Sequence, residues 1–191
     1  MQNKEMTQFV VDLLNQNLPS TYYFHDYQHT LYVLAKTEEI AMEEGVTEQE
    51  MHLLKAAALW HDVGYIHAYK GHEYESCILA QKYLPDFGFN EDDIHQICEM
   101  IMATMVPQDP HNRLEKILAD ADLAYLGTSD APVFARQLFL ELQSINPGLS
   151  ETEWIKTQIS FLKSHQYFTA CSKKKFESKK EIYMATLPRY L

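Results

Sequence analysis

The residues of this chain best able to do chemistry are histidines and aspartates at three separated places. His61 and Asp62 are adjacent and follow a long helical run that ends at Trp60, while His29 and Asp122 lie far away in sequence. Imidazole nitrogen and carboxylate oxygen suit Mn, Fe, Co, Ni and Zn and, less well, Mg. A mixed ligand set of this kind leaves positions open for water and substrate, so the pattern predicts a hydrolytic site with a divalent metal ion.

The His61-Asp62 pair closes a helix that the sequence predicts to be buried. Thr47-x-x-Glu50 indicates a capping box at the start of this helix, and apolar residues fill the turns that follow. A polar pair against a core is tolerated only when its members are paired or ligated. Ligation is the natural resolution here, although the dipeptide alone is common.

A second histidine-bearing segment precedes that helix. His25 and His29 are separated so that a helix beginning near Asp26 would let both imidazoles face one cavity. One of them could bind metal while the other handles a proton. The alternative is a pair of histidines on an aromatic-rich surface turn.

The third place is an apolar helix that carries two aspartates. Asp120 and Asp122 are two positions apart, so their side chains point about 200° from one another on a helix. Only one of them can face the interior, and we expect the other to face solvent. Spacing by itself does not choose between them.

The order of His29, His61-Asp62 and Asp122 resembles the H…HD…D signature of the HD-domain metal-dependent phosphohydrolase superfamily. The resemblance implies that these four residues hold the metal ion. It also implies that Asp122, rather than Asp120, is the ligand.

The segment from Tyr23 to His29 also resembles the tyrosine-histidine-asparagine motif of cyclic-nucleotide phosphodiesterases, which share this fold. Here Phe24 is inserted after the tyrosine and Asp26 replaces the asparagine. This second resemblance implies that His25 is the general acid for the leaving oxygen and that His29 is a metal ligand.

Further candidates stand near these motifs. His67, His72 and Glu73 could supply a second metal site, orient a bound water or meet the substrate, and surface solvation is the equally weighted alternative. Lys70 and Arg113 are candidate substrate-binding cations, because phosphate recognition often uses such groups. Ordinary surface charges are the alternative for both.

These residues favour hydrolysis of a small, nucleotide-like phosphoester. In this hypothesis Asp62 holds the ion and orients the attacking water, and His25 protonates the leaving oxygen. Two other classes stay open. A dinuclear site completed by His67, His72 or Glu73 would indicate a di-iron oxygenase, and a site without turnover would indicate a non-catalytic nucleotide-binding module.

The elements that must position these residues are helices. The apolar period predicts helices over 74–84, 91–105, 112–126, 132–145 and 150–170, with a mixed tail from Ser172. We expect one all-α domain, a helical bundle over 1–191, in which the motifs occupy 22–127 and the helices of 128–191 complete the bundle.

Charge and composition exclude several classes of protein. The 16 Lys and Arg against 27 Asp and Glu give a net charge of −11, which disfavours binding to long nucleic acid or to an anionic membrane. The three cysteines form no CxxC pair, and no apolar run approaches the roughly 20 residues of a membrane span. We therefore expect a cytoplasmic protein whose partner is a small phosphorylated molecule; the sequence leaves open whether the chain forms a homo-oligomer.

Overall fold

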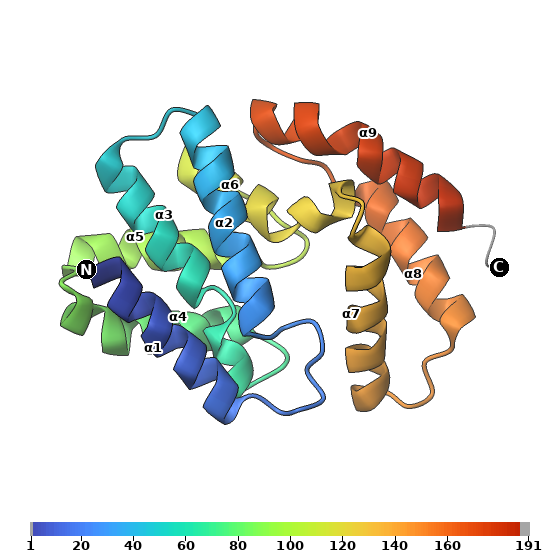
Figure 1. Ribbon diagram of the computed structural model, residues 1–191, viewed down its shortest axis with the longest axis horizontal. Coiled ribbons are helices and arrows are strands. Elements are labelled where there is room, and N and C mark those ends of the chain that lie inside the picture. Colours follow the sequence, from blue (N-terminus) through green and yellow to red (C-terminus); the bar gives the residue numbers. More distant parts are fainter. Residues whose placement is uncertain (1, 188–191) are drawn as a thin grey trace.

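Helices form all the regular structure of residues 2–187, the part of the chain described by this computed structural model (Figure 1). In chain order they are α1 (Gln2–Asn17), α2 (Tyr27–Glu43), α3 (Glu48–Trp60), η1 (Val63–Ile66), α4 (His72–Tyr83), η2 (Leu84–Phe87), α5 (Glu91–Met102), α6 (Arg113–Asp122), η3 (Ala124–Gly127), α7 (Ala131–Ile145), α8 (Glu151–Ser164) and α9 (Ala170–Thr186). Elements named η are short 3-10 helices. The predicted all-α class is confirmed.

Local sequence sets where several of these helices begin. Thr47, Asn90 and Ser150 are the N-cap residues of α3, α5 and α8, and each takes part in a reciprocal capping box. Such a box satisfies backbone amides that have no partner within the helix. The cap predicted at Thr47 is therefore confirmed, and the helices predicted from 91 and from 150 begin at Glu91 and Glu151.

The helices α1 to α6 pack around one apolar core. Val33 and Ile40 of α2, Leu54 of α3, Ile97 of α5 and Ile117 of α6 have no exposed surface. Full burial of such a side chain contributes about 1.5–3 kcal/mol. No helix within residues 2–187 is both long enough and apolar enough to cross a bilayer.

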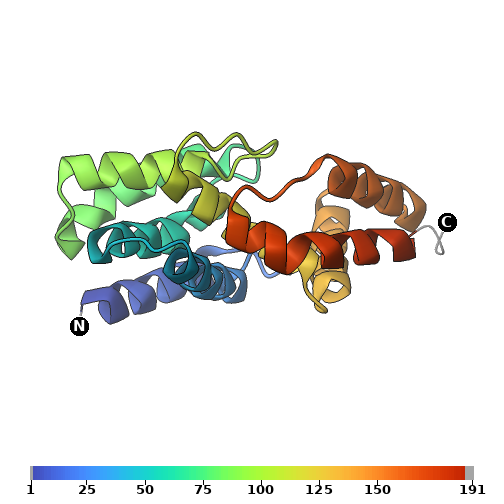
Figure 2. The same cartoon turned by 90° about the horizontal axis from the view of Figure 1, so that it is seen from above.

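The helices α7 to α9 form a second group beside the first (Figure 1). A smaller core joins the two groups, because Phe24 of the first packs with Leu126 of η3 and with Ile155 and Leu162 of α8. Seen from above, α9 begins beside the first group and runs outward (Figure 2). The assignment of 1–191 to one domain stays a prediction.

Two predicted helices are interrupted, and the two interruptions contact each other. The helix predicted over 112–126 ends at Asp122, and the one predicted over 150–170 ends at Ser164. The buried hydroxyl of Tyr167 donates a hydrogen bond to the carbonyl of Leu123 at 3.2 Å. A contact between residues distant in sequence therefore joins the two interruptions, and local periodicity does not register such a contact.

The tail after Ser172 is helical rather than mixed, and α9 docks closely on η3. A Cβ at Gly127 would lie 2.4 Å from the Cβ of Phe176, so this contact requires glycine. Lys175 pairs with acidic side chains of α2, and Lys180 is buried. These two lysines therefore take part in packing rather than in a solvated face.

Candidate metal centre

The first histidine-bearing segment is fixed by the beginning of α2. Asp26 is the N-cap residue, and its carboxylate accepts hydrogen bonds from the backbone amides of Gln28 at 2.8 Å and His29 at 3.0 Å. The cap places His29 in the first turn, where the side chain is buried against the ring of Phe24. The predicted helix start near Asp26 is confirmed.

The second segment follows the end of α3, which is buried along its last two turns. His61 is fully buried and Asp62 is 6% exposed. His61 Nδ1 lies 2.8 Å from the carbonyl oxygen of Ala58 and donates to it. This bond leaves Nε2 as the nitrogen with a free lone pair, the form in which a histidine binds metal.

Gly64 allows α4 to approach this segment. A Cβ at position 64 would lie 1.9 Å from the carbonyl oxygen of His72, so another residue would push α4 away. The Gly64 amide donates to Ser76 Oγ at 2.8 Å, and Ser76 Oγ donates to the carbonyl of His61 at 2.7 Å. The start of α4 is thereby held against the His61-Asp62 segment.

The two aspartates of α6 have different roles, and both face the interior. Asp120 is fully buried, and its oxygens accept from the Phe168 amide at 2.8 Å and from the Thr169 amide and hydroxyl at 2.8 and 2.6 Å. The expectation that Asp120 faces solvent is wrong, because the chain before α9 folds back over this side of the helix. Asp122, the last residue of α6, faces the histidines instead.

The structure brings the four predicted metal ligands together. His29 Nε2 lies 3.2 Å from Asp122 Oδ1 and 3.4 Å from Asp62 Oδ2. His61 Nε2 lies 3.1 Å from Asp62 Oδ2 and 3.6 Å from Asp122 Oδ1. One ligand atom from each of His29, His61 and Asp122 lies within 4.8 Å of the others.

The chemistry of this cluster fits a cation. Among the described residues, His61 Nε2 and Asp62 Oδ2 are buried without a hydrogen-bond partner, although they lie 3.1 Å apart. Both atoms are acceptors when Nδ1 carries the proton of His61.

The carboxylates of Asp62 and Asp122 favour a positive charge within the cluster. Burial lowers the pKa of His61, but the carboxylates of Asp62 and Asp122 raise it by more, to well above its ordinary value. Burial raises the pKa of Asp122, but hydrogen bonds from His29 and His61 lower it to about 2. The residues present therefore fit a divalent metal ion, which would supply the positive charge that these ionised groups attract.

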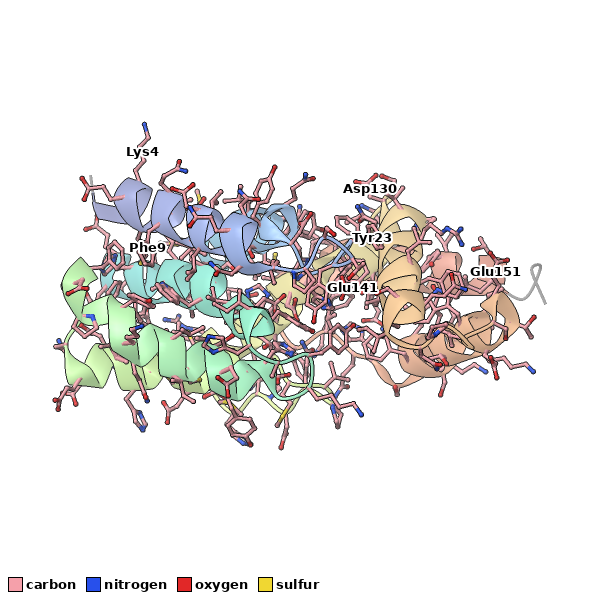
Figure 3. All side chains as sticks on the ribbon, turned by 90° about the horizontal axis from the view of Figure 1, so that it is seen from below. Lys4, Phe9, Tyr23, Asp130, Glu141 and Glu151 are labelled. Carbon is pink, nitrogen blue, oxygen red and sulfur yellow. The ribbon has the colours of Figure 1, made fainter. Side chains whose placement is uncertain are left out.

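His25 lies beside the cluster and is held by Glu141 of α7, a residue that the sequence analysis missed. His25 Nδ1 donates to Glu141 Oε1, and the backbone amides of Phe24 and His25 donate to Oε2 at 2.9 and 3.0 Å. Tyr69 donates its hydroxyl to Oε1 at 3.1 Å. Glu141 is fully buried at the junction of α7 with the loop that carries Tyr23 (Figure 3). A signal existed in the sequence, because Glu141 falls on the apolar side of the predicted helix 132–145.

The charge of Glu141 is stabilised by His25. Burial raises the pKa of this carboxyl, but its hydrogen bond and ion pair with His25 hold the pKa below its ordinary value. On its other edge, His25 Nε2 lies 3.0 Å from the hydroxyl of Tyr65. The Tyr65 ring stacks between His25 and His72, with ring centroids 4.1 and 3.8 Å away.

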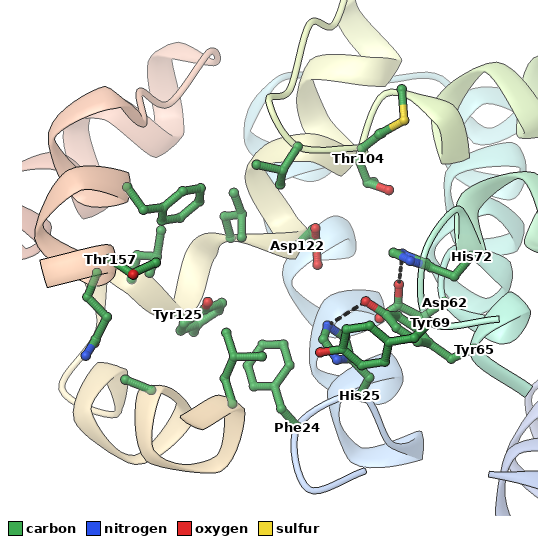
Figure 4. A pocket seen from close by; sticks show the side chains of 18 of the residues that line it. Phe24, His25, Asp62, Tyr65, Tyr69, His72, Thr104, Asp122, Tyr125 and Thr157 are labelled. Carbon is green, nitrogen blue, oxygen red and sulfur yellow. Dashed lines mark hydrogen bonds and ion pairs between the residues drawn. The ribbon is translucent and has the colours of Figure 1, made fainter. Parts of the chain in front are cut away.

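A cavity of about 500 Å³ opens between the two groups of helices (Figure 4). Asp62, Asp122 and His72 lie at one end, and Tyr125 and Thr157 lie at the other. The Thr104–Val106 stretch, in the loop that follows α5, borders the cavity. The metal cluster therefore has direct access to a space large enough for a small organic molecule.

Comparison with protein families decides the classification. The model of the HD domain family matches residues 26–124, the segment that contains all four clustered residues. The chain belongs to the HD domain family. No curated protein sequence is significantly similar to this HD-domain protein.

Solved structures share the fold. A predicted HD superfamily hydrolase from an uncultured Thermotogales bacterium has 21% sequence identity and a TM-score of 0.64, over 96% of this chain and 90% of its own. The Lin1889 protein of Listeria innocua has 16% identity and a TM-score of 0.63, over 98% and 96%. YpgQ of Bacillus subtilis, in complex with ADP, has 15% identity and a TM-score of 0.69, over 100% and 95%.

Two of the further candidates lie at the metal centre of this HD-domain protein. His72 Nε2 is 3.3 Å from Asp62 Oδ1 and 3.6 Å from Glu73 Oε1, on the side of Asp62 away from His61. Burial lowers the pKa of His72, but Asp62 raises it by more, so the pKa is raised. Lys70 also lines the cavity, from the loop before α4.

The other two candidates lie elsewhere. His67 is exposed and pairs with Glu75 at 3.1 Å, so the structure does not bring it to the cluster. Arg113 pairs with Glu50 at 2.6 Å and does not line the described cavity. The start of α6 points Arg113 toward α3, whereas the opposite end of the same helix carries Asp122. The substrate-binding assignment of Arg113 is therefore not supported by its position.

Proposed function

We propose that this HD-domain protein is a metal-dependent phosphohydrolase that acts on a small, nucleotide-like phosphoester. The observation that carries the proposal is the convergence of His29, His61, Asp62 and Asp122 at one end of an open cavity. Membership of the HD domain family supports a hydrolytic use of this arrangement.

In this proposal the four clustered residues hold one divalent ion. When bound, such an ion lowers the pKa of a water molecule and offsets phosphate charge. Asp62 has one oxygen, Oδ2, facing His61 and a second, Oδ1, that lies 3.3 Å from His72 Nε2. The second oxygen of Asp62 therefore orients the attacking water, and His72 holds that oxygen in place.

His25 acts as the general acid. Glu141 accepts from Nδ1 and fixes the orientation of the imidazole, so that Nε2 is the nitrogen available for proton transfer. His25 lines the cavity beside Asp62, where a leaving oxygen would be within its reach. Proton donation of this kind typically contributes 10²–10⁴-fold to the rate. Glu141 acts through His25 and is a positioning residue.

Lys70 lines the cavity and offers a positive charge to a bound anion. A structure of similar fold, YpgQ, was solved with ADP. The adenosine part of that ligand supports a nucleotide-like organic group. The substrate partner in this proposal is therefore a small phosphorylated molecule.

A second ion is favoured by the position of His72 and Glu73. These side chains meet Asp62 on the side away from His61, so His72, Glu73 and Asp62 are the residues that would hold a second ion. Two ions suit a two-metal phosphohydrolase or a di-iron oxygenase. Two irons per chain, consumption of O₂ and no release of phosphate would indicate the oxygenase. Stabilisation by nucleotides without turnover would indicate a binding module.

The experiment measures metal content and phosphate release together. The purified protein is loaded with Mn, Fe, Co, Ni, Zn or Mg and offered phosphomonoesters and cyclic nucleotides. We expect turnover that Asp62→Asn abolishes together with bound metal, and that His25→Asn reduces with metal retained. His95→Asn, at a side chain that is 75% exposed, is the matched control. Full turnover by the Asp62 variant, or after metal removal, would overturn the proposal.

A further inference from the structure

Few charged side chains line the cavity in the part of the chain that the structure describes. Asp62, Asp122 and Glu73 carry the acidic groups of its lining, and Lys70 is the one lysine or arginine of the lining among residues 2–187. An anion that carries more than one phosphate would find no arginine and no second lysine in the described lining.

The described arginines are already engaged elsewhere. Arg113 pairs with Glu50 at 2.6 Å, and Arg136 pairs with Glu151 at 3.1 Å on the surface. Neither lines the cavity. The bidentate arginine contacts that commonly hold polyphosphate chains are therefore absent from the described lining.

On the opposite side of the cavity, the part of the chain that the structure describes contributes no charged side chain. We call this side the neutral wall; α7, α8 and α9 supply its residues, which are Ala135, Leu138, Trp154, Thr157, Gln158, Phe161, Leu162 and Tyr183. Figure 4 shows Thr157 of this wall across the cavity from His72 and Asp62. An apolar and aromatic surface of this kind favours an uncharged organic group.

The polar atoms of the neutral wall are also uncharged. The hydroxyl of Tyr183 donates to Gln158 Oε1 at 2.8 Å, which orients the Gln158 amide. Thr157 donates its hydroxyl to the backbone carbonyl of Glu153 at 3.0 Å. These groups can hydrogen-bond to a ligand, but they cannot neutralise one.

Resting on the proposed function, we infer that the substrate is an ester of a single phosphate with an uncharged, largely apolar or aromatic organic group. The phosphate lies at the metal end and the organic group lies against the neutral wall. Nucleoside diphosphates and triphosphates are poor substrates. Their additional phosphates would have to leave water for a surface that offers no counter-charge.

The test compares esters that differ only in the number of phosphates. AMP, ADP and ATP share one organic group, and phenyl phosphate provides a small aromatic ester. The activating ion is held at one free concentration, because polyphosphates also bind divalent metals. We expect kcat/KM to fall at least about tenfold from AMP to ADP, and to fall further from ADP to ATP. Each tenfold fall corresponds to about 1.4 kcal/mol.

A charge placed in the neutral wall tests its location. Thr157→Arg puts a cation on an exposed position that lines the cavity. Ser160→Arg puts the same charge one turn along α8, at an exposed position outside the lining. We expect Thr157→Arg to raise the ADP-to-AMP ratio of kcat/KM by about tenfold. Ser160→Arg should leave the ratio at the wild-type value.

The outcomes separate the two proposals. Equal or faster hydrolysis of ADP or ATP by the wild-type protein would overturn the single-phosphate class while leaving a phosphohydrolase. Equal ratios in the Thr157 and Ser160 variants would overturn the placement of the organic group. Absence of metal-dependent hydrolysis for every ester would overturn the proposed function itself. Calorimetric binding of phenylphosphonate and methylenediphosphonate then tests the preference without turnover, and tighter binding of the diphosphonate would overturn it.

Discussion

Glu141→Gln is the substitution that best isolates the positioning of His25 from metal binding. In the structure the two carboxylate oxygens accept from Phe24 and His25 amides, from His25 Nδ1 and from the Tyr69 hydroxyl. Glutamine keeps the size of the side chain but replaces one acceptor oxygen by an NH₂ donor. Donors of the His25 segment would then face a donor.

The magnitude follows from the bonds that are lost. A hydrogen bond to a charged group contributes about 1.5–3 kcal/mol, so losing the bonds at one oxygen should lower the free energy of unfolding by about 3 kcal/mol. The rate should fall by about 10²–10³, within the 10²–10⁴ that a general acid supplies. Metal content should be unchanged, because Glu141 contacts His25, Phe24 and Tyr69 rather than the four metal ligands.

The assay combines kcat, metal content and urea unfolding for the wild type and two variants. Glu115→Gln is the matched control: Glu115 is also buried, and it accepts from the His111 amide at 2.6 Å and from Asn112 Nδ2 at 2.5 Å, outside the cavity. It should lose stability but not rate. Wild-type kcat in Glu141→Gln at full metal content would refute the reasoning. Independent, multiplying rate losses in the double variant with His25→Ala would also refute it.

Three further predictions concern α6 and the segment before α9. Asp122→Asn should lose most bound metal, measured by elemental analysis, and metal retention at the wild-type level would contradict the ligand assignment. Asp120→Asn should keep the metal but lower the free energy of unfolding by about 1–3 kcal/mol, because the amide replaces one of the two buried oxygens that accept hydrogen bonds from Phe168 and Thr169. Unchanged urea unfolding would contradict this. Burial, with Lys180 beside it, lowers the pKa of His165 from 6.5 to about 4. The unfolded chain therefore binds a proton that the folded chain does not, and stability should fall by at most about 3 kcal/mol as the pH drops through that interval. His165→Gln should flatten this dependence, His95→Gln should not, and an unaltered slope in the His165 variant would contradict the assignment.

The parts of the fold that could be predicted from the sequence are those set by neighbours in the chain. The caps at Thr47 and Ser150 depend on side chains three residues apart, which a sequence shows directly. The breaks at Leu123 and after Ser164 depend on each other through Tyr167. The apolar period continues past both breaks, so the helices predicted from it are longer than the observed ones.

The same distinction applies to the metal centre. The spacing of Asp120 and Asp122 shows that the two side chains diverge, but it does not show that both directions are buried. The segment of Phe168 and Thr169 covers Asp120, more than 40 residues later in the chain. Because the local sequence does not show which distant segment covers a helix, solvent is the simplest environment to predict for the second aspartate.

The segment that the HD-domain model matches is one part of the chain. The residues that hold His25 and form the neutral wall come from another part. Residues 26–124, which the HD-domain model matches, contain the four proposed metal ligands. Glu141, which holds His25, and the neutral wall both come from α7 to α9, outside that segment. Asp120 ties the beginning of α9 to the helix that carries Asp122. A change in how α7 to α9 dock would therefore alter the position of His25, the proposed general acid, and the shape of the cavity together, while the four proposed metal ligands stayed in place.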